Sequence, residues 1–250
     1  MQAINDIKAL TVHTLPPILV LTGEDVGQFE WLKKDILQKI AYDPSDLNYS
    51  YFDMKETSYA EVELDLVSLP FLADEKIVIL DHLLDLTTAK KRFLTDEDLK
   101  QFESYLEIPS ESTKLVIFAE GKLDSKRRLV KLLKRDAQIV EAMTPKDQDL
   151  KRYFASQAQE LGVKFVGDAL DQLLLKSGYD FGELQKNLAF LQAYKEDGQI
   201  TLEDVEEAVP KTLQDNIFDL TQMILKRQID QASNLVKDLR LQGEDEIKLI

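Results

Sequence analysis

Short apolar runs alternate with amphipathic segments along the first part of the chain. Residues 18–21, 77–80 and 115–119 are continuous apolar runs, the pattern of strands buried on both faces of a parallel sheet. Two further strands are predicted at 47–53, where apolar and aromatic residues alternate with others, and at 138–140. Because each parallel crossover needs a helix-length connection, helices are expected on both faces, and periodicity predicts them at 24–40, 59–69, 96–106 and 125–135.

From residue 142 onward the pattern is helical and contains no strand-like run. Thr144 is predicted to cap the first of these helices, with Pro145 at its first helical position, and Thr201 to cap a later one. Pro210 interrupts the pattern. Helices are predicted at 147–161, 166–177, 181–194, 201–209, 217–226 and 229–242. The predicted fold class is α/β followed by all-α, with an α/β domain at 1–141, a helical domain at 142–210 and the start of a third, helical domain at 211–250.

The segment 68–76, Ser-Leu-Pro-Phe-Leu-Ala-Asp-Glu-Lys, lies between a predicted helix and a predicted buried strand. Pro70 fixes its own φ and lacks an N–H, so it ends the helix and stiffens the turn that follows. Phe71 and Leu72 then stand at a corner, followed by charged residues. If they face solvent, they form a rigid apolar anchor for a protein partner. The alternative is that both fold inward and close the base of the domain, as large apolar residues usually do.

The formal net charge of the 250 residues is -15, which argues against a protein that binds nucleic acid with its whole surface. One segment is an exception, because residues 122–135 contain seven basic residues and the single acid Asp124, a formal charge of +6. A solvated helix face is the ordinary interpretation of such a run, and contact with phosphates or an acidic partner is the alternative. The basic residues are Lys122, Lys126, Arg127, Arg128, Lys131, Lys134 and Arg135.

The chain contains no cysteine, which excludes disulfides and thiolate metal sites and fits a reducing, cytoplasmic location. The first ten residues do not have the pattern of a signal peptide, and no run of about 18 apolar residues occurs. We therefore expect a protein that is neither secreted nor embedded in a membrane.

The turn after the first strand is where a phosphate-binding loop would lie. It reads Thr-Gly-Glu-Asp-Val-Gly-Gln at 22–28, without the Gly-Lys-Ser/Thr that binds phosphates and magnesium, and two acids stand in it. The run 77–81 is similar to the apolar strand and metal-binding Asp of an ATPase, but His82 replaces the expected acid. The only other histidine is His13, and no Gly-x-Ser-x-Gly elbow is present. We expect no catalytic site, no cofactor and no metal.

Several stretches, in order along almost the whole chain, resemble the delta subunit of bacterial DNA polymerase III, the clamp-opening subunit of the sliding-clamp loader. Each motif is weak alone, since a Leu-Pro-Phe corner or a Gly-Glu turn occurs by chance, but six in register are fairly specific. They are residues 19–25, 68–76, 122–128, 178–184, 187–191 and 243–246.

The resemblance implies an AAA+/RecA-like parallel-sheet domain without a functional phosphate loop, then a small helical domain and the opening helices of a helical collar domain. It implies a non-catalytic subunit of a DNA-directed DNA polymerase holoenzyme, which binds the sliding clamp and opens its ring during DNA replication. The implied partners are the sliding clamp (beta subunit), ATP-binding tau/gamma-type and delta-prime-type loader subunits, and DNA through the assembled complex. A divergent AAA+-type ATPase and a regulatory protein-binding adaptor are the alternatives.

The family's clamp-binding wedge is a pair of large apolar residues at the corner before the third strand. By position this pair is Phe71 and Leu72, which we expect to be largely exposed. The clamp-binding residues implied by the resemblance are Leu69, Pro70, Phe71 and Leu72. Four basic residues are the candidates for contact with DNA or a partner, namely Lys122, Lys126, Arg127 and Arg128.

Overall fold

The computed structural model describes residues 1–195, 197–210 and 213–241. The chain divides into two compact units, Met1–Asp149 and Leu150–Ile250. The three domains expected from the sequence, with boundaries after residues 141 and 210, stay a prediction, and the motif at 243–246 lies outside the described residues. Within the described residues, none of the helices combines the length and apolarity needed to cross a bilayer.

The first unit is built on a five-stranded sheet in which every neighbouring pair is parallel. Its strand order is β2-β3-β4-β1-β5, so the chain crosses over four times. All amino ends therefore lie at one edge of the sheet and all carboxyl ends at the other. This confirms the predicted parallel sheet, whose strands are β1 (Ile18–Gly23), β2 (Tyr49–Asp53), β3 (Lys76–Asp81), β4 (Thr113–Glu120) and β5 (Gln138–Ala142).

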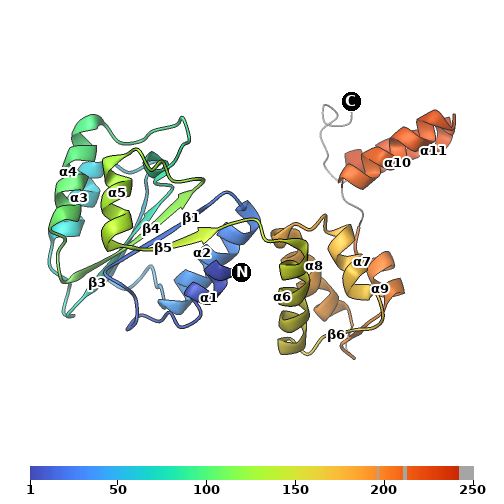
Figure 1. Cartoon of the computed structure of the whole chain (residues 1–250), viewed down its shortest axis with the longest axis horizontal. Coiled ribbons are helices and arrows are strands. Elements are labelled where there is room, and N and C mark those ends of the chain that lie inside the picture. Colours follow the sequence, from blue (N-terminus) through green and yellow to red (C-terminus); the bar gives the residue numbers. More distant parts are fainter. Residues whose placement is uncertain (196, 211–212, 242–250) are drawn as a thin grey trace. The chain divides into compact units, whose positions relative to one another are not determined.

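Helices cover both faces of this sheet (Figure 1). The face that bears α1 (Gln2–Asp6) and α2 (Val26–Lys39) buries Leu19, Val116 and Phe118. Alternate residues of the same strands, such as Val20 and Ile117, face the other side. That side packs against α3 (Tyr59–Val67), α4 (Asp96–Glu107) and α5 (Arg128–Asp136), and the short 3-10 helix η1 (Leu84–Leu86) follows β3.

The second unit is mainly helical, as predicted, but two expectations are wrong. First, a pair of two-residue strands, β6 (Lys164–Phe165) and β7 (Gln199–Ile200), joins in parallel, and runs this short give no periodicity to detect. Second, α6 begins at Asp147, so Thr144 is not its N-cap. The helices are α6 (Asp147–Glu160), α7 (Ala169–Lys176), α8 (Phe181–Tyr194), α9 (Leu202–Ala208), α10 (Leu213–Leu225) and α11 (Ile229–Leu241).

The predicted cap at Thr201 is confirmed as a capping box. The Thr201 hydroxyl accepts the Asp204 N–H at 3.3 Å, and the Asp204 carboxylate accepts the Thr201 N–H at 2.8 Å. Each bond satisfies a backbone donor that a helix start leaves without a partner. The Lys195 ammonium, the Thr201 hydroxyl and the Thr201 N–H all donate to the Asp204 carboxylate, and they lower its pKa to about 2.

Candidate functional site

Residues 68–75, here called the corner, connect the end of α3 to the start of β3 at the amino edge of the sheet. Leu69 is 84% exposed, Phe71 57% and Leu72 92%. The expectation that Phe71 and Leu72 are exposed is confirmed, and the alternative that they fold inward is wrong. Single exposed apolar side chains are ordinary on a folded chain, but a contiguous cluster of them is typical of a binding surface.

A buried lysine fixes the two ends of the corner to each other. Lys76 is only 4% exposed, and its ammonium donates to the Asp65 carbonyl and, at 2.6 Å, to the Ser68 hydroxyl. It also pairs with the Asp65 carboxylate at 3.5 Å. A cation at the carboxyl end of a helix is favoured by the helix dipole, by up to about 2 kcal/mol in partly buried geometries. Lys76 therefore joins the start of β3 to the last turn of α3.

A second contact holds the middle of the corner. The Phe71 N–H donates to the Asn48 side-chain oxygen at 3.0 Å. Asn48 is itself fixed, because its N–H donates to Asp46 at 2.9 Å and its carbonyl accepts the Ile77 N–H at 2.8 Å. The next residue, Leu72, has a φ of 52°, a left-handed conformation that costs an L-residue about 1 kcal/mol or more. The corner is thus a braced and locally strained turn, a feature common at functional sites.

Further exposed apolar side chains lie at the same edge of the sheet. Leu47 precedes β2, Leu64 and Val67 lie in the last turns of α3, and Ile108 caps the end of α4. In a parallel α/β unit the helices run back toward the amino ends of the strands, so these positions share one edge with the corner. These residues can extend the apolar surface that the corner presents to a partner.

The helix predicted at 125–135 is present as α5 (Arg128–Asp136), but it starts later than periodicity predicts. Because α5 begins only at Arg128, Lys122, Lys126 and Arg127 lie in the loop before it. The Arg127 guanidinium donates to the Asp85 carbonyl at 2.7 Å and pairs with Asp124 at 3.4 Å.

Arg128 pairs with two acids of α4, Glu103 at 3.5 Å and Glu107 at 2.5 Å. Lys122 and Lys126 are exposed, and no ion pair of either occurs within the described part of the chain. Of the four candidates, the two arginines therefore bond to groups of the same chain, and the two lysines face solvent.

Two backbone donors at the end of β1 and in the turn after it are bonded within the chain. The Gly23 N–H donates to the Gly121 carbonyl at 3.0 Å, and the Asp25 N–H donates to the Ala142 carbonyl at 3.3 Å. The Asp25 carboxylate accepts the Gln28 N–H at 2.8 Å and so caps α2. A Cβ on Gly23 would lie 2.1 Å from the Ala142 oxygen. The glycine is therefore required for close packing against β5, and these N–H groups are not directed at a ligand.

Asp81 occupies the position that resembles the metal-binding Asp of an ATPase, but its carboxylate forms an ion pair with a lysine of the same chain. Its carboxylate pairs with the Lys33 ammonium at 2.6 Å and accepts the Tyr51 hydroxyl at 2.6 Å. The His82 ring lies 3.3 Å from Asp81 and 3.0 Å from Asp53. Burial and the bond to Asp81 raise the pKa of Tyr51, so its hydroxyl stays protonated and donates. The carboxylate that would hold a metal in an ATPase is therefore occupied by this polar cluster.

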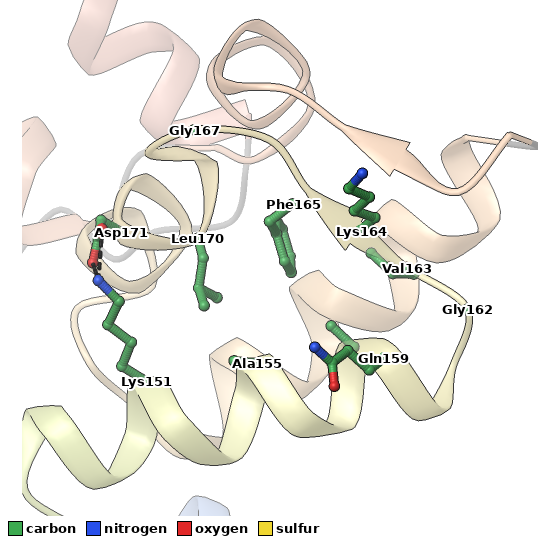
Figure 2. Close-up of a pocket in the computed structure, with 11 residues that line it drawn as sticks. Lys151, Ala155, Gln159, Gly162, Val163, Lys164, Phe165, Gly167, Leu170 and Asp171 are labelled. Carbon is green, nitrogen blue, oxygen red and sulfur yellow. Dashed lines mark hydrogen bonds and ion pairs between the residues drawn. The ribbon is translucent and has the colours of Figure 1, made fainter.

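A cavity of about 650 Å³ lies within the second unit, between α6, β6 and α7 (Figure 2). Phe165, Leu170 and Ala155 line it, and Lys151 and Asp171 form an ion pair of 2.6 Å beside it. None of the residues that the sequence singled out for a site lines this cavity.

Sequence reasoning missed the residues that support these sites. Lys33 is 48 residues from Asp81, and Asn48 is 23 residues from Phe71. Periodicity and local motifs carry no signal for such pairs. Lys76 could have been noticed, because a lysine directly before a buried apolar run needs a partner when the strand is covered on both faces.

Comparison with known proteins places the chain in a family. Residues 19–143 match the DNA polymerase III delta subunit family, and residues 214–250 match its C-terminal domain. A DNA polymerase III subunit delta from Bacillus subtilis is 28% identical over 249 residues, covering 97% of this chain and 71% of that protein.

The comparison with solved structures agrees with this family assignment. The DNA clamp loader delta protein of Bacillus subtilis superimposes with a TM-score of 0.71 at 25% identity, covering 99% of this chain and 74% of that one. A RuvB variant of Thermotoga maritima superimposes with a TM-score of 0.52 at 12% identity, over 91% of this chain and 76% of that one. The second similarity concerns the fold alone, and it confirms the predicted AAA+/RecA-like class. The chain therefore belongs to the DNA polymerase III delta subunit family.

Proposed function

We propose that this chain is a non-ATPase clamp-loader subunit that binds the sliding clamp through the corner and opens the clamp ring. The observation that carries the proposal is the exposed Phe71–Leu72 pair, braced by Asn48 and Lys76, in a member of the delta family. A pre-organised apolar anchor binds well because little conformational freedom remains to be lost on association. Leu69 and Pro70 complete the clamp-binding surface.

Ring opening requires that the subunit bind the open clamp more tightly than the closed one, because equal affinity would shift nothing. Moving a ring from almost always closed to almost always open takes about 5.5 kcal/mol of differential binding. Burying the two side chains of Phe71 and Leu72 yields about 1.5–3 kcal/mol each. The two side chains can therefore supply the required difference only if they are buried almost entirely in the complex with the open ring. Otherwise further apolar contacts, such as those of Leu64 and Val67, must contribute.

The carboxyl edge of the sheet supports the proposal that this subunit does not itself bind ATP. The N–H groups of Gly23 and Asp25 are bonded within the chain, and Lys33 neutralises Asp81. Both features support a subunit that leaves ATP to partner subunits of the tau/gamma and delta-prime types. DNA is contacted through the assembled complex, and of the four basic candidates Lys122 and Lys126 are the ones available for it.

The test is release of a clamp ring from nicked circular DNA in the presence of this chain alone, without ATP. Because ring opening is assigned to differential binding, we expect release to accelerate with the concentration of the chain and to saturate. Unchanged release, together with no binding of the chain to immobilised clamp in surface plasmon resonance, would refute the proposal.

Asn48 is a positioning residue for the corner, since it holds the Phe71 N–H. Asn48→Ala is expected to weaken clamp binding about 3- to 10-fold, because one net hydrogen bond contributes about 0.5–1.5 kcal/mol. Asn48→Asp keeps an acceptor oxygen for the Phe71 N–H but sets its other oxygen against Asp46, to which the Asn48 amide nitrogen donates at 3.1 Å, so it is expected to restore only part of the affinity. Surface plasmon resonance measures both, and equal weakening by the two variants would show that the bond to Phe71 is not what matters.

A further inference from the structure

Two loops at the carboxyl edge of the sheet bring exposed lysines together from separate parts of the sequence. Lys90 and Lys91 lie in the loop between β3 and α4, and Lys122 and Lys126 lie in the loop between β4 and α5. We call these four residues the loop lysines. Since β3 and β4 are neighbours in a parallel sheet, both loops leave the sheet at the same edge.

Backbone bonds join the two loops into one platform. The Thr88 N–H donates to the Lys122 carbonyl at 2.8 Å, and the Asp124 N–H donates to the Leu86 carbonyl at 2.9 Å. Between these bonds, Thr87 and Leu123 form an antiparallel bridge. Lys122 is therefore bonded to Thr88, which is only two positions before Lys90. The backbone contacts between the two loops thus place their lysines near one another.

The arginines of the same loops are used to build the platform. Arg127 donates to the Asp85 carbonyl at 2.7 Å, and Arg92 donates to the Ala89 carbonyl and, at 3.1 Å, to the Lys91 carbonyl. The loop lysines are exposed, and along the described parts of the chain none of them forms an ion pair.

The two acids of the loops are also engaged. Asp124 accepts the Lys126 N–H at 3.1 Å and pairs with Arg127, which lowers the pKa of this carboxyl. Asp85 is buried and accepts the Phe93 N–H at 3.0 Å. The loops therefore keep an excess of positive charge in a chain whose formal net charge is -15.

We propose that the loop lysines form a binding site for the phosphate backbone of duplex DNA on this subunit itself. Like charges held together on a fixed platform repel one another, and a polyanion relieves that repulsion. Ammonium groups bind phosphate as point charges and need no bidentate geometry. The proposal rests on the loader function proposed above, because a subunit of a DNA polymerase assembly meets a phosphate backbone, and it adds Lys90 and Lys91 to the surface.

The test is fluorescence anisotropy of a short labelled DNA duplex with the full chain over a series of salt concentrations. One variant carries Lys90→Gln, Lys91→Gln, Lys122→Gln and Lys126→Gln. The matched control removes the same charge from exposed lysines elsewhere in the first unit, through Lys8→Gln, Lys34→Gln, Lys55→Gln and Lys100→Gln. Because all eight side chains are exposed, both variants should unfold at the wild-type temperature.

We expect the loop variant to bind at least about 10-fold more weakly at low salt and the control to stay within about 2-fold. The slope of log affinity against log salt should flatten by about 0.9 for each phosphate that the variant no longer neutralises. Equal weakening by both variants, no binding by the wild type, or equally strong competition from polyglutamate would overturn the proposal. Clamp binding, measured in parallel, should be unchanged in the loop variant. Absence of clamp binding by the wild type would refute the loader function separately.

Discussion

Replacing Phe71 and Leu72 together by alanine is expected to weaken clamp binding by about 100-fold or more. Burial of each side chain contributes about 1.5–3 kcal/mol, and about 1.4 kcal/mol corresponds to a factor of ten. Because both side chains are exposed in the free chain, the same change should leave the unfolding temperature almost unaltered. Surface plasmon resonance on immobilised clamp and a thermal melt measure the two effects.

The matched control is a second exposed pair of the same residue types, Phe190 and Leu175 in the helical unit. Phe190→Ala/Leu175→Ala removes a similar apolar area and should leave clamp affinity unchanged. If the control variant loses as much affinity as the corner variant, the corner is not the anchor.

The second large effect is on stability. Lys33→Met should lower the free energy of unfolding of the first unit by about 3 kcal/mol, the lower end of the range for removing one partner of a buried pair, since the Lys33 side chain is 15% exposed. The variant leaves the Asp81 carboxylate, 5% exposed, without its ammonium. Urea unfolding followed by the fluorescence of Trp31, the single tryptophan, reports on this unit because Trp31 lies in α2.

Two comparisons show whether the ion pair causes the loss. Lys34→Met changes the neighbouring, exposed lysine and should alter the free energy of unfolding by less than about 0.5 kcal/mol. Adding Asp81→Asn to Lys33→Met should recover part of the loss, because a neutral amide can still accept the Tyr51 hydroxyl. A Lys33→Met variant as stable as the wild type would mean that solvent replaces the ammonium at Asp81.

The sequence predicts the elements of the first unit well, because buried strands and amphipathic helices repeat with different periods. Its errors have physical causes. The helix predicted at 125–135 begins only at Arg128, because Arg127 donates to the Asp85 carbonyl and pairs with Asp124 in the loop before it. The strand pair at Lys164 and Gln199 is too short to show alternation.

The candidate site was predicted only in part. The exposure of Phe71 and Leu72 was expected from the resemblance to the delta family, because the local sequence leaves open whether the two side chains fold inward. The brace at Asn48 depends on β2 and β3 becoming neighbours, so it is visible only in the folded chain. The same holds for Lys90 and Lys91, a short basic pair whose meaning depends on the adjacent loop.

The most direct test of the central claim is photo-crosslinking from the corner. A benzophenone side chain replaces Phe71 in one sample and Phe190 in another, and each protein is irradiated with the sliding clamp. The account predicts a crosslink to the clamp from position 71, competed away by unlabelled wild-type chain, and little from position 190. A clamp crosslink from position 190 but not from position 71 would contradict it.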